Sequence, residues 1–239
     1  MKTVILIIVL GLIVVASINA DPITNWLTDP ATPVAREVRH DFWKTLAIIA
    51  PFLLIAEGLL FFIVLKFRSK PGRKAATFKD NVRLEVFWTL IPLIAVSIIA
   101  WSGYKVLNDI DVPPESDLVV EVIGHQFFWE YRYPRYGVTI VNETMIVPAD
   151  KVVTLNCTSV DVIHSWWVPA FGVKQDAVPG RITHTWFKAR AGKYKGQCAE
   201  LCGPLHAEML IDVNVVPDVE FTEWLKSKKG HDALGEENL

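Results

Sequence analysis

Hydrophobic and polar positions divide the chain into two regions with different patterns. Residues 42–67 and 86–106 are continuous apolar stretches, each long enough to cross a hydrocarbon core that requires about 20 residues. From residue 115 onward, short segments rich in β-branched and aromatic residues are separated by Pro or Gly, which is typical of β-strands. The pattern therefore predicts a mixed fold, in which a transmembrane helical hairpin precedes an all-β sandwich or barrel.

The second region has the size of a single domain, which we place at residues 115–229. Apolar positions at helical spacing predict a closing amphipathic helix at 217–228, and the acidic residues 230–239 are expected to form a flexible tail. The predicted strands are 118–123, 126–133, 143–147, 152–159, 162–168, 183–187 and 209–215.

Residues 1–20 contain one Lys, a long apolar run and small residues that end at Ala20, which is the pattern of a secretory signal peptide. The sequence leaves open whether this segment is a signal peptide or is retained as an N-terminal helix. The membrane anchor then extends over residues 21–107. Three prolines within 21–39 predict an irregular external lead-in and not a packed element.

Charge fixes the orientation of the hairpin. The connection at 66–83 carries seven basic residues and one acidic residue, so the positive-inside rule places it in the cytoplasm and the β-domain on the other side of the membrane. The position of this basic run between two membrane helices argues against a nucleic-acid role. A hydrophobic content of 51%, a mean hydropathy of +0.31 and a length of 239 residues also fit a membrane anchor with one domain.

Two acidic residues fall in or beside the apolar stretches. Glu57 would be costly in lipid, so we expect it to make a polar contact with a partner helix, with a place on a proton path as the alternative. Glu85 lies where the second helix begins, beside Arg83, and a carboxylate is favourable at a helix N-terminus.

Metal-ligand residues concentrate in the stretch Gly-Gln-Cys-Ala-Glu-Leu-Cys-Gly-Pro-Leu-His-Ala-Glu-Met. Cys198, Cys202, His206 and Met209 offer thiolate, imidazole and thioether ligands, a set that suits copper better than structural zinc. His164, on a short apolar segment, is the candidate for a second imidazole. Because one blue-copper ion needs only one Cys, the extra thiolate indicates two copper ions that share two bridging sulfurs.

A disulfide between Cys198 and Cys202 is the alternative, since the domain lies on the oxidising side of the membrane. A disulfide would leave the nearby His206 and Met209 unexplained. Cys157 has no such neighbours and is interpreted as a small buried hydrophobe.

These residues resemble subunit II of haem–copper cytochrome c oxidases. The likeness extends over Val-Ile-His-Ser-Trp-Trp-Val-Pro and over Asp176-Ala-Val-Pro-Gly-Arg181. It implies a cupredoxin-like fold and the dinuclear copper centre CuA. The implied bridging ligands are Cys198 and Cys202, the implied capping ligands are His164 and His206, and the implied weak ligands are Met209 and the Glu200 carbonyl.

The resemblance also implies a function and partners. CuA would accept electrons from a c-type cytochrome and pass them to haem in subunit I, where O2 is reduced to water and protons are pumped. The protein would thus be a subunit of a proton-translocating oxidoreductase with further subunits, in a bacterial cytoplasmic membrane with its copper domain on the periplasmic side. The Glu200 side chain would share a magnesium ion with subunit I, Glu85 would lie at the mouth of a proton path, and Asp176 and Arg181 would support the copper-to-haem route.

One segment departs from the family pattern. In Gly-His-Gln-Phe-Phe-Trp-Glu, Phe127 and Phe128 stand where the family has Trp and Tyr, and that Trp is the point where electrons enter. Phe127 and Trp129 are the candidates for this role, although Trp129 also fits ordinary core packing. The chain has no Cys-x-x-Cys-His motif, so it carries no c-type haem of its own.

Two alternative functions are compatible with the residues. One is a subunit of an oxidase or nitric oxide reductase with an unusual donor, for example a quinol. The other is a membrane-tethered copper carrier. The intact copper ligands argue against the usual quinol type, and Glu85 and Glu200, which are useful only beside subunit I, argue against the carrier.

Overall fold

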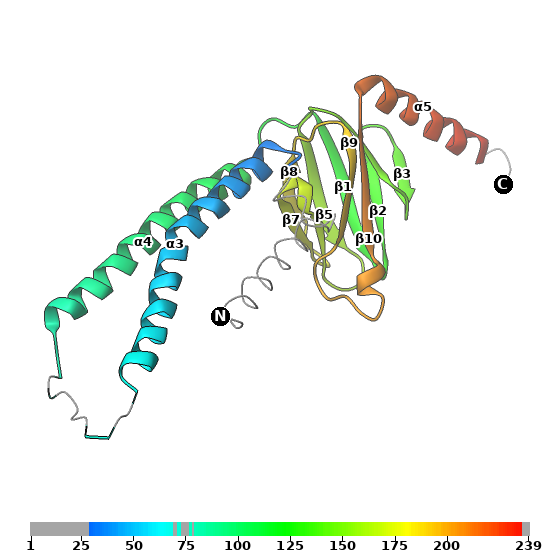
Figure 1. Ribbon diagram of the computed structural model, residues 1–239. Helices are drawn as coiled ribbons and strands as arrows, with labels where there is room; N and C mark the ends of the chain where they lie inside the picture. Colours follow the sequence, from blue (N-terminus) through cyan, green and yellow to red (C-terminus); the bar gives the residue numbers. More distant parts are fainter. Residues whose placement is uncertain (1–28, 69–70, 73–76, 78, 236–239) are drawn as a thin grey trace. The chain divides into compact units, whose positions relative to one another are not determined.

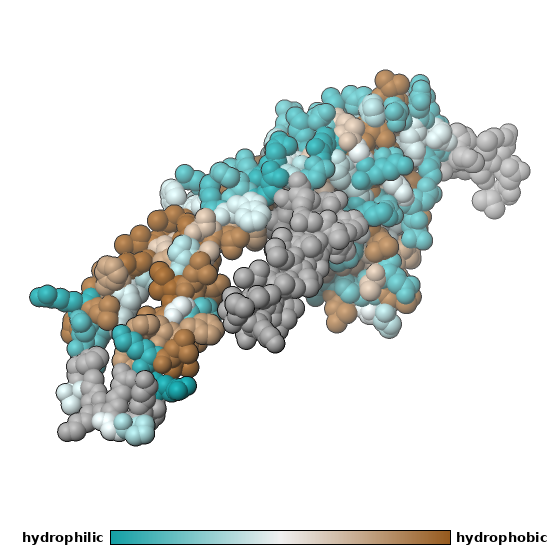
Figure 2. Space-filling model, viewed as in Figure 1, coloured by the Kyte–Doolittle hydropathy of each residue, from teal (hydrophilic) through white to brown (hydrophobic). Residues whose placement is uncertain are grey.

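The two apolar stretches form two long helices, α3 (Pro33–Lys66) and α4 (Val82–Asp111), each long and apolar enough to cross a membrane. Their hydrophobic side chains gather on the surface of this part of the chain (Figure 2). The structure, a computed structural model, describes residues 29–68, 71–72, 77 and 79–235, so the signal peptide or helix expected at 1–20 lies outside it. Residues 40–107 form one compact unit, and the described residues on either side of them form a second.

Both helices are longer than predicted. α3 begins at Pro33 and not at residue 42, because the Thr32 hydroxyl caps its N-terminus by accepting a hydrogen bond from the Ala35 amide at 2.9 Å. α4 begins at Val82 and ends at Asp111, beyond the predicted 86–106, and its first turn is capped by the Asn81 side chain. The apolar stretches underestimated the length of both helices, because each helix has polar ends that lie outside its apolar stretch.

The end of the lead-in packs against the β-domain, which corrects the prediction of an unpacked segment at 21–39. Ala31 and Ala35 are buried. The Ala31 amide donates to the Ala170 carbonyl at 2.8 Å, and the Arg190 amide donates to the Ala31 carbonyl at 3.2 Å. Gly172 allows the start of α3 to pack closely here, since a Cβ atom on residue 172 would lie 2.7 Å from the Ala35 Cα.

The predicted β-sandwich is confirmed, and it consists of two five-stranded sheets (Figure 1). The first sheet has the order β3-β2-β1-β5-β8, with β1 and β5 parallel, and consists of β3 (Val138–Val141), β2 (Phe128–Tyr133), β1 (Leu118–His125), β5 (Val153–Ser159) and β8 (Thr183–Phe187). The second sheet has the order β4-β10-β9-β6-β7, with β4 and β10 parallel, and consists of β4 (Met145–Pro148), β10 (Leu210–Val216), β9 (Gly192–Cys198), β6 (His164–Val168) and β7 (Val173–Ala177).

Three strands were not predicted: β3, β7 and β9. β9 reads Gly-Lys-Tyr-Lys-Gly-Gln-Cys and has no β-branched residue. It forms because β10 and β6 flank it and pair with it on both sides. β3 and β7 lie at sheet edges and are short, so their local signal is weak.

Large side chains from both sheets fill the space between them. Trp166, Phe171 and Phe187 are almost fully buried, and the rings of Phe171 and Phe187 stack with centroids 4.4 Å apart. The C-terminal helix α5 (Asp218–Gly235) covers one end of this core with Phe221 and other apolar side chains. α5 continues to Gly235, beyond the predicted helix end at 228, and residues 236–239 lie outside the described part. The flexible tail at 230–239 stays a prediction.

We expect Gly172→Ala to lower the stability of the protein more than Gly137→Ala does. Both glycines have positive φ, at +72° and +66°, so alanine costs roughly 1 kcal/mol at either position. Only Gly172 also packs against Ala35, where overpacking adds about 1–3 kcal/mol. Thermal unfolding of the detergent-solubilised chain measures the difference, and equal losses in the two variants would contradict tight packing of the lead-in.

Candidate metal centre

Three neighbouring strands of the second sheet position the candidate ligands. His164 is the first residue of β6, Cys198 is the last residue of β9, and Met209 directly precedes β10. The Cys198 amide donates to the Met209 carbonyl at 2.9 Å, which ties β9 to β10 at this end. The connection between those two strands carries Cys202 and His206, so all five side chains come to one end of the sandwich.

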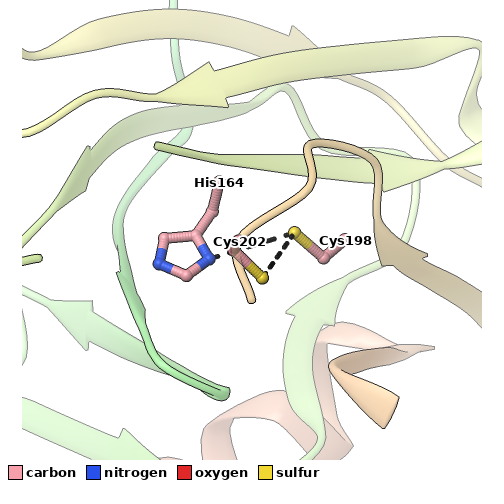
Figure 3. Close-up of side chains that lie close together, drawn as sticks. All are labelled: His164, Cys198 and Cys202. Carbon is pink, nitrogen blue, oxygen red and sulfur yellow. Dashed lines mark hydrogen bonds between the residues drawn. The ribbon is translucent and has the colours of Figure 1, made fainter. Parts of the chain in front are cut away.

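The structure brings the predicted ligand atoms into one chain of contacts. The sulfurs of Cys198 and Cys202 are 4.0 Å apart (Figure 3). Cys198 Sγ lies 3.9 Å from Nδ1 of His164, and Cys202 Sγ lies 3.6 Å from Nδ1 of His206 and 3.9 Å from Sδ of Met209. A pair of sulfurs is thus flanked by one imidazole next to each sulfur.

The backbone carbonyl of Glu200 completes the set, because it accepts a hydrogen bond from the Cys198 thiol at 3.3 Å. The Glu200 side chain itself is exposed. His164, Cys198 and Cys202 satisfy the spacing of a metal-binding group, with ligand atoms within 4.8 Å of one another.

The spacing of the sulfurs fits shared metal ligands. Two thiolates about 2.3 Å from one tetrahedral metal ion lie about 3.8 Å apart, close to the 4.0 Å between Cys198 and Cys202. Both cysteines are free thiols in the structure and not a disulfide. Cys157 is also a free, buried thiol, and burial raises its pKa to about 12, as expected of a structural cysteine.

Asp161 orients His164, a role that sequence reasoning did not assign. Its carboxylate accepts a hydrogen bond from His164 Nε2 at 2.8 Å, which leaves Nδ1 directed at Cys198. The same carboxylate accepts the amide hydrogens of Val162 at 2.6 Å and Gln126 at 2.7 Å. A carboxylate three residues before a ligating histidine is a signal that could have been used, since such partners commonly fix the ring nitrogen that binds metal.

Gly124 and Gln126 bring strand β1 against the site, and neither was singled out from sequence. A Cβ atom on Gly124 would lie 2.7 Å from Cδ2 of His164, so only glycine leaves room for the ring. The Gln126 side chain donates to the Cys202 carbonyl at 2.6 Å. Gln126 therefore bonds both sides of the site, since its amide donates to Asp161, the partner of His164, and its side chain donates to the Cys202 carbonyl.

The electrostatics of the metal-free site distinguish the two thiols. Burial favours the neutral thiol of Cys198, but hydrogen bonds with His164 and with backbone groups outweigh burial and lower its pKa to about 6. Burial and the neighbouring Cys198 charge raise the pKa of Cys202 to about 11. Burial alone would lower the pKa of His164, yet its hydrogen bonds to Cys198 and Asp161 raise it. The metal-free site therefore favours a pair formed by the Cys198 thiolate and the His164 imidazolium.

The aromatic segment lies against this site. Trp129 is buried, and its indole meets the His164 ring edge-on with centroids 5.9 Å apart. Among the described residues, the Trp129 Nε1 has no hydrogen-bond partner. Phe127 is half-buried and packs on Gly203, where a Cβ atom would lie 3.0 Å from the Phe127 ring. The two candidates for electron transfer thus contact different ligand-bearing segments.

The remaining predicted residues lie outside this cluster. Glu85 is exposed in the first turn of α4 and belongs to the unit 40–107. Asp176 pairs across β6 and β7 with Ser165, the residue after His164. Arg181 is exposed in the turn that follows β7. None of these three side chains supplies an atom to the chain of ligand contacts.

Comparison with known proteins agrees with this arrangement. Residues 20–106 match the family model "Cytochrome C oxidase subunit II, transmembrane domain", and residues 136–216 match "Cytochrome C oxidase subunit II, periplasmic domain". A probable cytochrome c oxidase subunit 2 of Rickettsia bellii is 37% identical over 230 residues, which cover 87% of this chain and 85% of the relative. Cytochrome c oxidase subunit 2 of Cereibacter sphaeroides is 34% identical over 238 residues, which cover 84% of this chain and 78% of the relative.

Among solved structures, the periplasmic domain of subunit II of cytochrome oxidase from Bradyrhizobium japonicum is 40% identical, with a TM-score of 0.49. The match covers 50% of this chain and 99% of that domain.

The fold and the site define a membrane-anchored β-sandwich protein with a sulfur-rich group that could bind copper. The chain belongs to the cytochrome c oxidase subunit II family. It is therefore an electron-transfer subunit of a haem–copper terminal oxidase, as the resemblance implied.

In the metal-free protein we expect one thiolate to form as the pH rises through about 6, because the pKa of Cys198 is lowered to that value. Cys202 and Cys157 stay protonated until about pH 11 and 12. Ultraviolet thiolate absorbance during a pH titration measures the step, which should disappear in Cys198→Ser. His164→Gln should move the step to higher pH and Cys157→Ser should leave it unchanged. A step that survives in Cys198→Ser would contradict the assignment.

Proposed function

We propose that this chain holds a dinuclear copper centre of the CuA type, accepts electrons from a c-type cytochrome and passes them to haem in subunit I. The observation that carries the proposal is the pair of sulfurs 4.0 Å apart, with an imidazole nitrogen beside each. Cys198 and Cys202 would bridge the two ions, and His164 and His206 would cap them. Met209 and the Glu200 carbonyl would be the weak ligands.

The donor set fits copper. Thiolate, thioether and imidazole together select copper over zinc or hard cations, and a single blue-copper ion would use only one of the two cysteines. When bound, such a centre supplies reversible one-electron chemistry. The pKa of Cys198 is already low without metal, so one of the two thiols is ready to lose its proton for binding.

The protein's own contribution is a rigid and largely dry setting. His164, Cys198 and Met209 are each at most 2% exposed. Their backbone is held by strand pairing, and the His164 ring is held by Asp161 on one side and by Trp129 on another. Ligands that cannot move when the charge changes favour rapid electron transfer. His206 differs from the other candidate ligands, because it is only half-buried.

Trp129 and Phe127 are the proposed points where the electron from the cytochrome enters. Phe127 reaches the surface in part and packs on Gly203, the residue after Cys202. Trp129 contacts His164 from the interior. Since the family's Trp is replaced at Phe127, an unusual donor stays the alternative to a typical c-type cytochrome.

Further proposals follow from the match to the family's membrane and periplasmic domains. The exposed Glu200 side chain would share a magnesium ion with subunit I, while its carbonyl faces the copper site. Glu85, exposed at the start of α4, would lie at the mouth of a proton path. Asp176 and Arg181 would support transfer toward haem, in a bacterial cytoplasmic membrane with the β-domain on the periplasmic side.

Copper loading of the full chain in detergent tests the centre directly. We expect two copper ions per chain and a mixed-valence electron paramagnetic resonance spectrum in which the electron is shared by both ions. Cys198→Ser should abolish that spectrum because it removes one bridging sulfur, whereas Cys157→Ser should retain it because no hydrogen bond joins Cys157 Sγ to a candidate ligand among the described residues. One copper ion per chain with a mononuclear spectrum would refute the dinuclear proposal.

Asp161→Ala should weaken copper binding about 10- to 100-fold, the usual effect of removing the carboxylate behind a metal-bound histidine. Asp161→Asn, which keeps a hydrogen-bond acceptor, should lose less. Competition with a copper chelator measures the affinity. Asp212→Asn is the matched control, because it neutralises an exposed aspartate of β10 that pairs only with Lys195 among the described residues. Equal affinities of Asp161→Ala and Asp212→Asn would remove Asp161 from the site.

A further inference from the structure

The connection between β9 and β10, residues 199–209, is the metal loop, and its backbone is fixed to the sheet at both ends. At its start the Ala199 amide donates to the Ser165 carbonyl of β6 at 2.9 Å, and its last residue is bonded to the end of β9. The backbone hydrogen bonds within residues 203–209 close short turns of the loop itself. Such turns shape the loop but do not determine where its middle lies on the domain.

A single side chain ties the middle of the metal loop to another part of the domain. The side-chain amide of Gln126 donates to the Cys202 carbonyl at 2.6 Å. Among the residues that the structure describes, this is the one hydrogen bond that joins residues 200–208 to a residue outside 198–209. Gln126 is itself fixed, because its backbone amide donates to the Asp161 carboxylate at 2.7 Å. The donor is therefore anchored before it reaches the loop.

The next residue of the loop, Gly203, brings Gln126 and Phe127 together on it. A Cβ atom on residue 203 would lie 3.0 Å from the Phe127 ring and 3.1 Å from Nε2 of Gln126. The absence of a side chain at this position therefore lets both residues close on the loop. The hydrogen bond to Cys202 and the packing of Phe127, a candidate for electron entry, belong to one contact region.

We propose that Gln126 is a positioning residue of the electron-transfer site, whose side-chain amide fixes Cys202 and keeps the metal loop closed on Phe127. This role rests on the proposed copper centre, in which Cys202 would be a bridging ligand. The carbonyl that accepts the hydrogen bond belongs to the same residue as the sulfur, so a shift of this carbonyl also displaces the sulfur relative to Cys198. Partners behind a metal ligand set its position in this way, and a ligand that is already in place rearranges little when the charge changes.

Hydrogen–deuterium exchange of the metal-free full chain in detergent tests the hold on the loop without copper. Gln126→Leu removes the donor but keeps the backbone amide that bonds Asp161, and Gln126 is exposed, so the change leaves no cavity in the core. We expect the amides of residues 200–208 to exchange about twofold to tenfold faster, on the scale of one net hydrogen bond. Exchange in β6 and β10 should stay unchanged.

Two further variants control the exchange experiment. Gln126→Glu has the same shape but no donor when it is ionised, so it should behave like Gln126→Leu. Gln175→Leu is the matched control, because Gln175 is half-buried in β7 and no hydrogen bond reaches its side chain among the described residues. Unchanged exchange at 200–208 in both Gln126 variants, or an equal increase throughout the β-domain, would overturn the proposal.

Electron paramagnetic resonance of the copper-loaded full chain tests the effect on Cys202. Gln126→Leu should still bind two copper ions, but their hyperfine splittings should become less equal because one bridging sulfur has moved. The variant should also lose copper to a chelator about twofold to tenfold faster, whereas Gln175→Leu should match the original chain. An unaltered spectrum in Gln126→Leu would overturn the positioning role. A mononuclear spectrum in the original chain would instead refute the dinuclear centre, and the exchange rates at 200–208 would then decide by themselves whether Gln126 holds Cys202.

Discussion

The pairing of β9 with both β6 and β10 is the constraint on which the site depends. It sets Cys198 opposite Trp166 on one side and bonds it to Met209 on the other. Because side chains alternate between the two faces of a strand, a slip of one residue would turn Cys198 away from His164. The burial of Trp166 between the sheets opposes such a slip, so the packing of the core and the geometry of the ligands are specified together.

The ring of the candidate ligand His164 is held by contacts of three kinds. Asp161 bonds its Nε2, Gly124 leaves the space that its ring occupies, and Trp129 meets it edge-on. Each contact comes from a different part of the chain. An electron-transfer site gains from this arrangement, because rigid ligands need little rearrangement when one electron arrives or leaves.

The two units of the chain distribute their polar and apolar side chains differently, as expected for surroundings of water and of lipid. In the β-domain, polar groups such as Asp161 are satisfied by neighbouring amides and apolar side chains are turned inward. In α3 and α4 the apolar side chains are turned outward, as expected of helices in lipid. Glu57 is a polar exception in the apolar part of α3, where no hydrogen bond or ion pair reaches its carboxyl group among the described residues.

The sequence by itself determined the features that depend on local pattern. The two apolar stretches predicted the long apolar helices, β-branched and aromatic residues between Pro and Gly predicted seven of the strands, and the spacing of Cys198, Cys202, His206 and Met209 indicated a candidate metal-binding loop. These features are legible because each rests on residues close together in the chain.

Only the tertiary structure decided the rest. β9 has no β-branched residue and exists because two neighbours bond to it, and α3 starts early because Thr32 caps it and Ala35 packs against Gly172. The contact of Asp161 with His164 is local and could have been suspected from their spacing, but the bond that fixes the Asp161 carboxylate to the amide of Gln126 joins residues far apart in the chain and appears only in the fold. Contacts between distant residues leave no periodic trace in the sequence, so their consequences appear only when the chain is folded.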